Sequence, residues 1–389
     1  MCLVCELVYL DDLTELEVCE YVTEIPELPQ SLKKLECHNC PSLRYLPELP
    51  QSLEELYCNR CYSLNTLPEL PQSLINLYCS DCPLITTLPE LPQSLKELWC
   101  TKCPLLQSLP VLPQTLKELG CDGCPLLQSL PELPQSLVHF NCGKCPLIQS
   151  LPELPLLLLE FYCFGCPLLQ SLPELPQSLT HLICPKCLSL GCLPRLPQSL
   201  TYLWCYECPL LQSLPELPQS LTTLYCYKCP SLQSLPILPQ SVIELSCYEC
   251  LLIQSLPELP QSLEILDCSN CPSLKYLPKL PQSLVRFYCN DCPLLTALPE
   301  IPQSLREFNC DGCTSIIFYS QNIKHHISPV LQETINSNYL KWRQEQTLNW
   351  FSSKTGLLYE DLVRRTWHPD RVVDWCWDTE EVKWFKSLK

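Results

Sequence analysis

Apolar and polar residues along this chain repeat with a period of 21 residues, without insertion or deletion, from about residue 26 to residue 313. The repeated unit reads LPELPQSLxxLxCxxCPxL. Aligned on the apolar residue before the second proline, the 14 copies begin at Leu28, Leu49, Leu70, Leu91, Leu112, Leu133, Leu154, Leu175, Leu196, Leu217, Leu238, Leu259, Leu280 and Ile301. A coil this short cannot bury its own apolar face, so a strict short period predicts a solenoid of stacked coils.

The phase of apolar residues inside one copy predicts which element each part forms. Apolar positions fall at Leu53, Leu56, Cys58, Cys61 and Leu64, and the middle of this segment alternates with period 2, as a strand does. The LPELPQS part carries two prolines three residues apart, which excludes an α-helix and favours extended or polyproline backbone. The predicted fold class is a β-rich solenoid with a parallel concave sheet and an extended convex side.

The motif LxxLxCxxCxxL resembles the leucine-rich repeat motif LxxLxLxx(N/C)xxL. Cys58 takes the place of the last strand leucine and Cys61 that of the turn residue. The copies look like short, LPxLP-type, cysteine-containing leucine-rich repeats. They resemble the repeat proteins of large DNA viruses and, more distantly, the LPX leucine-rich repeat effectors of bacteria. The resemblance implies a protein that binds other proteins, with a host protein as the expected partner.

The repeat boundaries predict three parts. Residues 1–25 echo the repeat imperfectly and two residues short, which indicates an N-terminal cap. Residues 26–318 form the solenoid. Residues 319–389 hold six of the eight tryptophans at plausible helical spacing, which predicts a small helical C-terminal cap or domain.

Composition narrows the function classes. The chain has 42 acidic and 25 basic residues, a net charge of −17, which argues against nucleic-acid binding because that needs a basic stripe. The N-terminus is neither basic nor followed by an apolar stretch long enough for a signal peptide or membrane span. We therefore expect an intracellular monomer in the cytoplasm, the host cytoplasm if the protein is viral, with no membrane contact.

Thirty-three cysteines admit three explanations. Most form CxxC pairs such as Cys37/Cys40, and the spacing between pairs fits a zinc signature. Disulfides are the second explanation. In register, however, each cysteine stacks on its equivalent about 4.8 Å away. Buried free cysteine behaves as a small hydrophobe with a weak donor. We favour this structural ladder of reduced thiols and predict no metal and no cofactor.

Residues that vary between copies indicate the binding surface. The position before the first cysteine points outward from the strand, and half of its occupants are tyrosine or tryptophan. Together with nearby positions they predict a partner-binding field of eight aromatic residues: Tyr162, Phe164, Tyr202, Trp204, Tyr206, Tyr225, Tyr227 and Tyr248. The alternative is that cross-strand stacking of these rings only stabilises the sheet. Lys144, Lys186, Glu207, Lys228 and Glu249 flank the field.

No catalytic arrangement is present in the sequence, which has no glycine-rich phosphate loop, HExxH motif or Ser-His-Asp order. The expected function is therefore a non-enzymatic scaffold that recognises a protein through its concave aromatic face. Two alternatives remain open. One is a soft-metal or redox protein that uses the CxxC ladders. The other is an adaptor whose tail, with the run Trp367–Arg371, recruits ubiquitin-ligase or chaperone machinery.

Overall fold

The structure is a computed structural model that describes residues 12–315. The chain divides into two compact units, the first ending at Cys250 and the second beginning at Leu251. The predicted helical C-terminal part, 319–389, and residues 1–11 of the predicted N-terminal cap lie outside the described residues.

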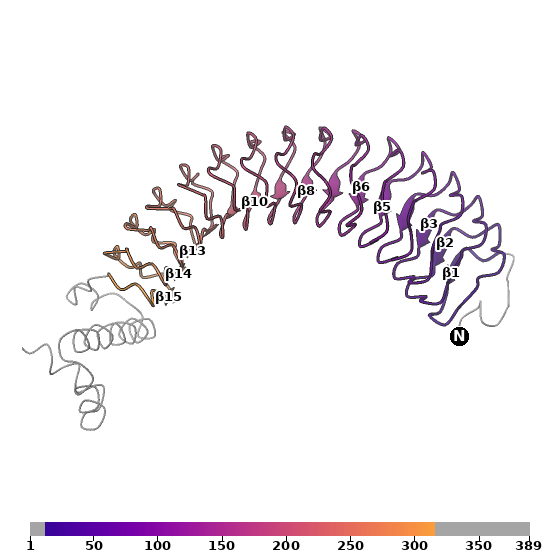
Figure 1. Ribbon diagram of the computed structural model, residues 1–389, viewed down its shortest axis with the longest axis horizontal. Coiled ribbons are helices and arrows are strands. Elements are labelled where there is room, and N and C mark those ends of the chain that lie inside the picture. Colours follow the sequence, from indigo (N-terminus) through magenta and orange to yellow (C-terminus); the bar gives the residue numbers. More distant parts are fainter. Residues whose placement is uncertain (1–11, 316–389) are drawn as a thin grey trace, which may run out of the picture. The chain divides into compact units, whose positions relative to one another are not determined.

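Each coil contributes one strand of three residues, and the strands of each unit pair in parallel in chain order (Figure 1). The strands of the first unit are β1 (Glu15–Glu17), β2 (Lys34–Glu36), β3 (Glu55–Tyr57), β4 (Asn76–Tyr78), β5 (Glu97–Trp99), β6 (Glu118–Gly120), β7 (His139–Asn141), β8 (Glu160–Tyr162), β9 (His181–Ile183), β10 (Tyr202–Trp204), β11 (Thr223–Tyr225) and β12 (Glu244–Ser246). Those of the second are β13 (Ile265–Asp267), β14 (Arg286–Tyr288) and β15 (Glu307–Asn309). This arrangement confirms the predicted β-solenoid with a parallel sheet.

The register of the strands follows the sequence period. Leu56 pairs with Leu35 on one side and with Leu77 on the other, so equivalent residues stack 21 positions apart. The first pair differs, since Leu16 pairs with Leu35 across 19 positions. The N-terminal residues, whose spacing to the next copy is two residues shorter, therefore form a coil that adds β1 to the sheet.

The interior of each coil is filled by the apolar positions of the repeat. In the third coil Leu53, Leu56, Cys58, Cys61 and Leu64 are all fully buried. In most strands the middle residue points inward while its two neighbours remain partly exposed, which is the alternation expected of a strand with one solvated face. In β6 and β11 one neighbour, Gly120 or Thr223, is also buried. Burial of this apolar surface between coils is the main stabilising term of a solenoid.

Two turns close the coil without a helix, one that begins at a proline and one that begins at the second cysteine, which a proline follows in most copies. The Leu53 N–H donates to the Pro50 carbonyl at 3.0 Å, and the Leu64 N–H donates to the Cys61 carbonyl at 3.1 Å. These are hydrogen bonds of β-turns, in which proline and small polar residues are favoured because proline presets φ.

Among residues 12–315, no helix long and apolar enough to cross a membrane is found.

The residue before the second cysteine of each coil has a left-handed backbone. Arg60 has φ 59° and Lys102 has φ 54°, while Gly123 takes the same place with φ 70°. The Arg60 N–H donates to the Ser80 carbonyl of the next coil at 2.8 Å. A non-glycine residue in this region costs roughly 1–2 kcal/mol, so the inter-coil bond offsets part of a local strain.

Side-chain hydrogen bonds tie each coil to the one before it. Ser73 Oγ donates to the Leu53 carbonyl at 2.6 Å, and Cys82 Sγ donates to the Cys58 carbonyl at 3.1 Å. The same two bonds recur in most coils of the first unit. The coil that carries Leu156 and Leu157 in place of Gln-Ser cannot make the hydroxyl bond, and these leucines are 73% and 60% exposed.

The cysteines of the CxxC pairs lie in the buried interior as free thiols, and the second thiol of most pairs is directed at a carbonyl oxygen. Sγ of the second cysteine reaches the first cysteine of the preceding coil, as Cys124 does to Cys100 at 3.3 Å. Among residues 12–315 no group of cysteine sulfurs converges as metal ligands do. The carbonyl contacts support the structural interpretation of the ladder, since the second thiol of most pairs donates to a buried carbonyl of the preceding coil.

Replacement of one such thiol tests its structural role. We expect Cys124→Ala to lower the free energy of unfolding by about 1–3 kcal/mol, because it removes the donor to the buried Cys100 carbonyl and leaves a small cavity. Cys124→Ser should cost less, since a hydroxyl can donate to the same oxygen. Urea denaturation of both variants under reducing conditions measures the difference. An equal or larger loss for serine would show that packing, not the hydrogen bond, dominates.

Candidate functional site

Three rows of side chains run across the strand face of the first unit, where the strands line the inner side of the curved stack (Figure 1). One row consists of the first residues of the strands, the second of their last residues, and the third of the residues two positions further. Parallel register places equivalent residues on neighbouring strands side by side, as Trp204 and Tyr225 are. A row therefore brings together residues 21 positions apart in sequence.

Six of the eight predicted aromatic residues lie together on the coils of β10–β12. Trp204 stacks on Tyr225 with ring centroids 5.4 Å apart. Tyr227 stacks between Tyr206 and Tyr248, at 4.3 Å from each. Tyr225 and Tyr227 join the two rows at 6.4 Å with tilted rings. We call these five residues and Tyr202 the aromatic face.

Tyr202 belongs to the first row and stacks on a residue that the sequence argument did not include. The His181 ring lies 4.4 Å from the Tyr202 ring at an angle of 12°, and His181 Nδ1 is 2.9 Å from Thr180 Oγ1. At 37% exposure Tyr202 is the most accessible ring of the aromatic face. The 21-residue spacing places His181 beside Tyr202, but the sequence argument considered only aromatic residues of the Phe, Tyr and Trp types and so did not include the histidine.

Tyr162 and Phe164 lie apart from the aromatic face. Ile183 occupies the register position between Tyr162 and Trp204, so the second row is aliphatic there. Pro185 fills the corresponding gap in the third row, between Phe164 and Tyr206. The predicted field is therefore two aromatic groups separated by the coil of β9.

The stacking decides what the aromatic face offers to a partner. Rings stacked at 4.3–5.4 Å cover part of each other's faces and leave mainly their edges to a partner. All but Tyr202 are only partly exposed. Stacking thus stabilises the sheet, as the alternative interpretation expects, and it also holds the rings rigid. Rigid aromatic side chains lose little entropy when a partner binds.

The indole N–H of Trp204 is a buried donor with no acceptor among the described residues. Trp99 Nε1, at the same repeat position five coils earlier, is in the same state. An unpaired buried donor costs roughly 1–3 kcal/mol, and such groups are rare enough to need an explanation. Both lie in the row whose occupants vary between coils.

Tyrosine hydroxyls elsewhere on the strand face are paired with glutamates of the first row. Tyr162 donates to Glu160 at 3.0 Å, and Tyr225 donates to Glu244 of the next strand at 2.5 Å. Burial, followed by the Glu160 hydrogen bond, raises the pKa of Tyr162 to about 12. These pairs fix the phenol orientations and add carboxylates to the edge of the face.

The predicted charged residues flank the aromatic residues because of the left-handed turn position. Lys144, Lys186, Glu207, Lys228 and Glu249 all have positive φ. Lys228 Nζ lies 5.8 Å from the centre of the Tyr248 ring, and Lys144 Nζ lies 5.5 Å from that of Phe164. Lys186 pairs with Glu207 at 3.7 Å. These contacts place alternating charges along one border of the aromatic face.

A second aromatic group on β3–β5 was not among the predicted site residues. Tyr57 and Tyr78 stack at 4.8 Å, and the Trp99 ring lies over Gly120, where a Cβ would clash with it at 2.2 Å. A shallow hollow of about 350 Å³ lies beside them. It is lined by His38, Asn39, Asn59, Arg60, Tyr78, Ser80, Asp81 and Trp99. The outward pattern showed these aromatics, but only the structure shows the hollow.

Comparison with solved structures assigns the class of protein. No protein-family model matches the sequence, and no curated protein matches it. The leucine-rich effector protein YopM from Yersinia pestis is 34% identical, with a TM-score of 0.61, over 76% of this chain and 89% of that one. YopM from Yersinia enterocolitica WA-314 is 27% identical, with a TM-score of 0.50, over 79% and 88%. The chain therefore belongs to the leucine-rich repeat proteins.

The circular leucine-rich repeat protein CroV588 is also similar, with 19% identity and a TM-score of 0.34 over 77% of this chain and 63% of that one. A likeness at this level carries no argument about function. The fold shared with the YopM structures is a scaffold of the kind used for protein interaction.

Proposed function

We propose that this chain is a non-enzymatic scaffold that binds a protein partner through the aromatic face on β10–β12. The observation that carries the proposal is the group of stacked rings around Trp204, whose buried N–H has no acceptor among the described residues. Aromatic residues with polar rims are the usual anchors of protein interfaces. Such a surface binds well because the rings are already held in place.

The related structures suggest which class of partner this chain binds. The Yersinia pestis protein is described as an effector, and this chain shares its repeat architecture. By this analogy the proposed partner is a host protein met inside the cell, and the working form is a monomer without membrane contact. The net charge of −17 makes nucleic acid an unfavourable partner.

Trp204→Ala tests the proposed surface. We expect it to weaken binding of a partner captured by the full chain about 30-fold or more, which corresponds to about 2 kcal/mol, because it removes the central ring of the face. The unfolding midpoint should change little, since the side chain is only partly buried. Isothermal titration with the purified partner measures both affinity and stoichiometry.

Trp99→Ala is the matched control, because Trp99 occupies the same repeat position and has the same unpaired N–H. It should leave the affinity unchanged. A partner that binds the Trp204 variant as tightly as the parent would refute the proposed surface. Loss of binding in the Trp99 variant alone would indicate that the interface lies on β3–β5.

A further inference from the structure

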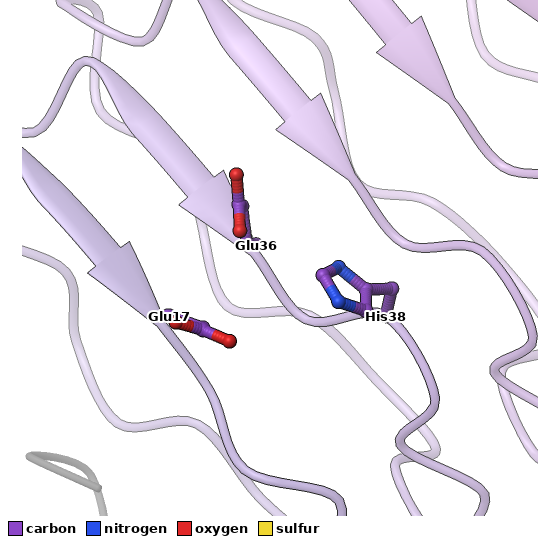
Figure 2. A group of neighbouring side chains, drawn as sticks. All are labelled: Glu17, Glu36 and His38. Atoms are coloured by element: carbon purple, nitrogen blue, oxygen red, sulfur yellow. The ribbon is translucent and has the colours of Figure 1, made fainter.

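Three potential metal ligands meet at the first two strands, outside the aromatic face. Glu17 ends β1 and Glu36 ends β2, and the parallel register pairs these two residues directly. His38 follows two residues after Glu36. Figure 2 shows the three side chains side by side, and one donor atom from each lies within 4.8 Å of the others. Two carboxylate oxygens and one imidazole nitrogen therefore lie near enough to one another to bind one ion after small side-chain movements.

The carboxylates of Glu17 and Glu36 repel each other when no cation is bound between them. Like charges on paired positions of neighbouring strands repel each other. Lys34 Nζ lies 2.5 Å from Glu36 Oε1, so it neutralises one carboxylate. The same ammonium lies 5.4 Å from the centre of the Tyr57 ring on β3, on the side of β2 away from β1. Within residues 12–315, no basic side chain forms an ion pair with Glu17.

His38 supplies a second, independent reason to expect a cation. Its side chain makes no hydrogen bond or ion pair with any described residue, so both ring nitrogens are available to a ligand. Neutral imidazole is the commonest nitrogen ligand of first-row transition metals. Calcium and magnesium, in contrast, select oxygen donors. A mixed oxygen and nitrogen set thus favours zinc over the alkaline-earth ions.

We propose that Glu17, Glu36 and His38 form a solvent-open site for a divalent transition-metal ion, with Zn²⁺ as the best fit. Three protein ligands leave the fourth tetrahedral position to water. Zinc ligands lie about 2.0–2.2 Å from the metal, hence about 3.4 Å from one another. The donors must approach by at most roughly 1.5 Å, which solvent-accessible glutamate and histidine side chains achieve by rotation.

The site is specific to this end of the solenoid. The residues in register with Glu36 on β3 and β4 are Tyr57 and Tyr78, so no later coil of this part repeats the ligand set. A metal held by β1 and β2 would join the terminal strand to the array. Because only the folded chain brings the ligands together, binding should also raise the stability of this end.

The test uses the full chain with its thiols reduced, titrated with Co²⁺ as a spectroscopic probe and with Zn²⁺ in competition. We expect one bound Co²⁺ per chain without the intense near-ultraviolet absorption of a cobalt-thiolate bond. Glu17→Gln and His38→Ala should each weaken binding about tenfold or more. Lys34→Gln should tighten it, because it removes the ammonium that competes for Glu36.

Glu15→Gln is the control, since Glu15 is an exposed carboxylate on the same strand that lies outside the ligand set. It should bind the metal like the parent. Unfolding midpoints measured without metal verify that all variants are folded. Absence of saturable binding, unchanged affinity in the Glu17 and His38 variants, or a cobalt-thiolate band would each overturn the proposal.

Discussion

Raising the pH from about 8 to about 10 in a reducing buffer is expected to unfold the first unit. Burial raises the pKa of most second-cysteine thiols of this unit above their ordinary value of 9.0. Cys61 and Cys187 are exceptions, because side-chain hydrogen bonds with Cys37 and Cys163 lower the pKa of these two thiols. The pKa is about 11 for Cys103 and Cys229, and about 12 for Cys82, Cys124, Cys145 and Cys166. The unfolded chain therefore loses these protons before the folded one.

The sign of the effect follows from this order. Stability due to the neutral thiols is fully present below about pH 9 and is lost as the pH rises from there through the folded pKa values of about 11 to 12. At one pH unit above the pKa of the thiol in the unfolded chain, each such thiol lowers the free energy of unfolding by about 1.4 kcal/mol. For the six thiols this is about 8 kcal/mol, a loss as large as the whole stability of many domains.

Circular dichroism against pH, with a non-thiol reductant, measures the transition, and its steepness reports the number of protons released. Cys124→Ser should remove one proton from that number and make the transition shallower. Folded protein at about pH 8 should also resist alkylation of these thiols. An array that keeps its signal through about pH 11, or whose thiols react at about pH 8, contradicts the argument.

Phe161→Ala is expected to lower the free energy of unfolding by about 3–5 kcal/mol, a larger loss than that expected for removal of a single thiol. Phe161 is fully buried and stacks on Phe140 with ring centroids 5.4 Å apart. The neighbouring strands hold Leu119 and Leu182 at the same position. Truncation therefore leaves a cavity between two coils that are otherwise closely packed, and urea denaturation measures the loss.

Phe161→Leu is the matched control, because it restores the residue that most coils carry. We expect a loss below about 1.5 kcal/mol, since the change removes little volume and the coil can repack. A loss for leucine as large as that for alanine would indicate that Phe140 and Phe161 contribute through ring stacking and not through filled volume.

The sequence predicted the fold because one physical constraint recurs in every copy. Alternation around Leu56, and prolines that exclude a helix, determine the strand and the opposite side of the coil. The left-handed turn was not predicted, since residues such as Arg60 and Lys102 hide a position that only Gly123 and its two glycine equivalents reveal. The conformation there is imposed by stacking, not by local preference.

The candidate surface was predicted less completely. Strand spacing correctly placed Trp204 beside Tyr225, but spacing alone does not show that Ile183 separates Tyr162 from them. The Glu17 cluster was not foreseen because its coil is two residues short, so its register with Glu36 does not follow from the 21-residue period. Side-chain convergence across coils of unequal length needs coordinates.

The hydrogen bonds between coils of the first unit have a consequence for how such a chain can evolve. Most of them join backbone groups, or a serine or cysteine to a backbone carbonyl, and these bonds make no distinction between one coil and another. The exceptions join outward-facing side chains, as Tyr225 to Glu244 does. Loss or gain of a whole 21-residue unit by recombination would create a junction with the same hydrogen bonds between coils and the same kind of apolar interior. The outward residues on the two sides of that junction would then lie one strand nearer to each other or one strand further apart. New combinations of surface side chains can arise in a single genetic step, without passing through an unfolded intermediate sequence.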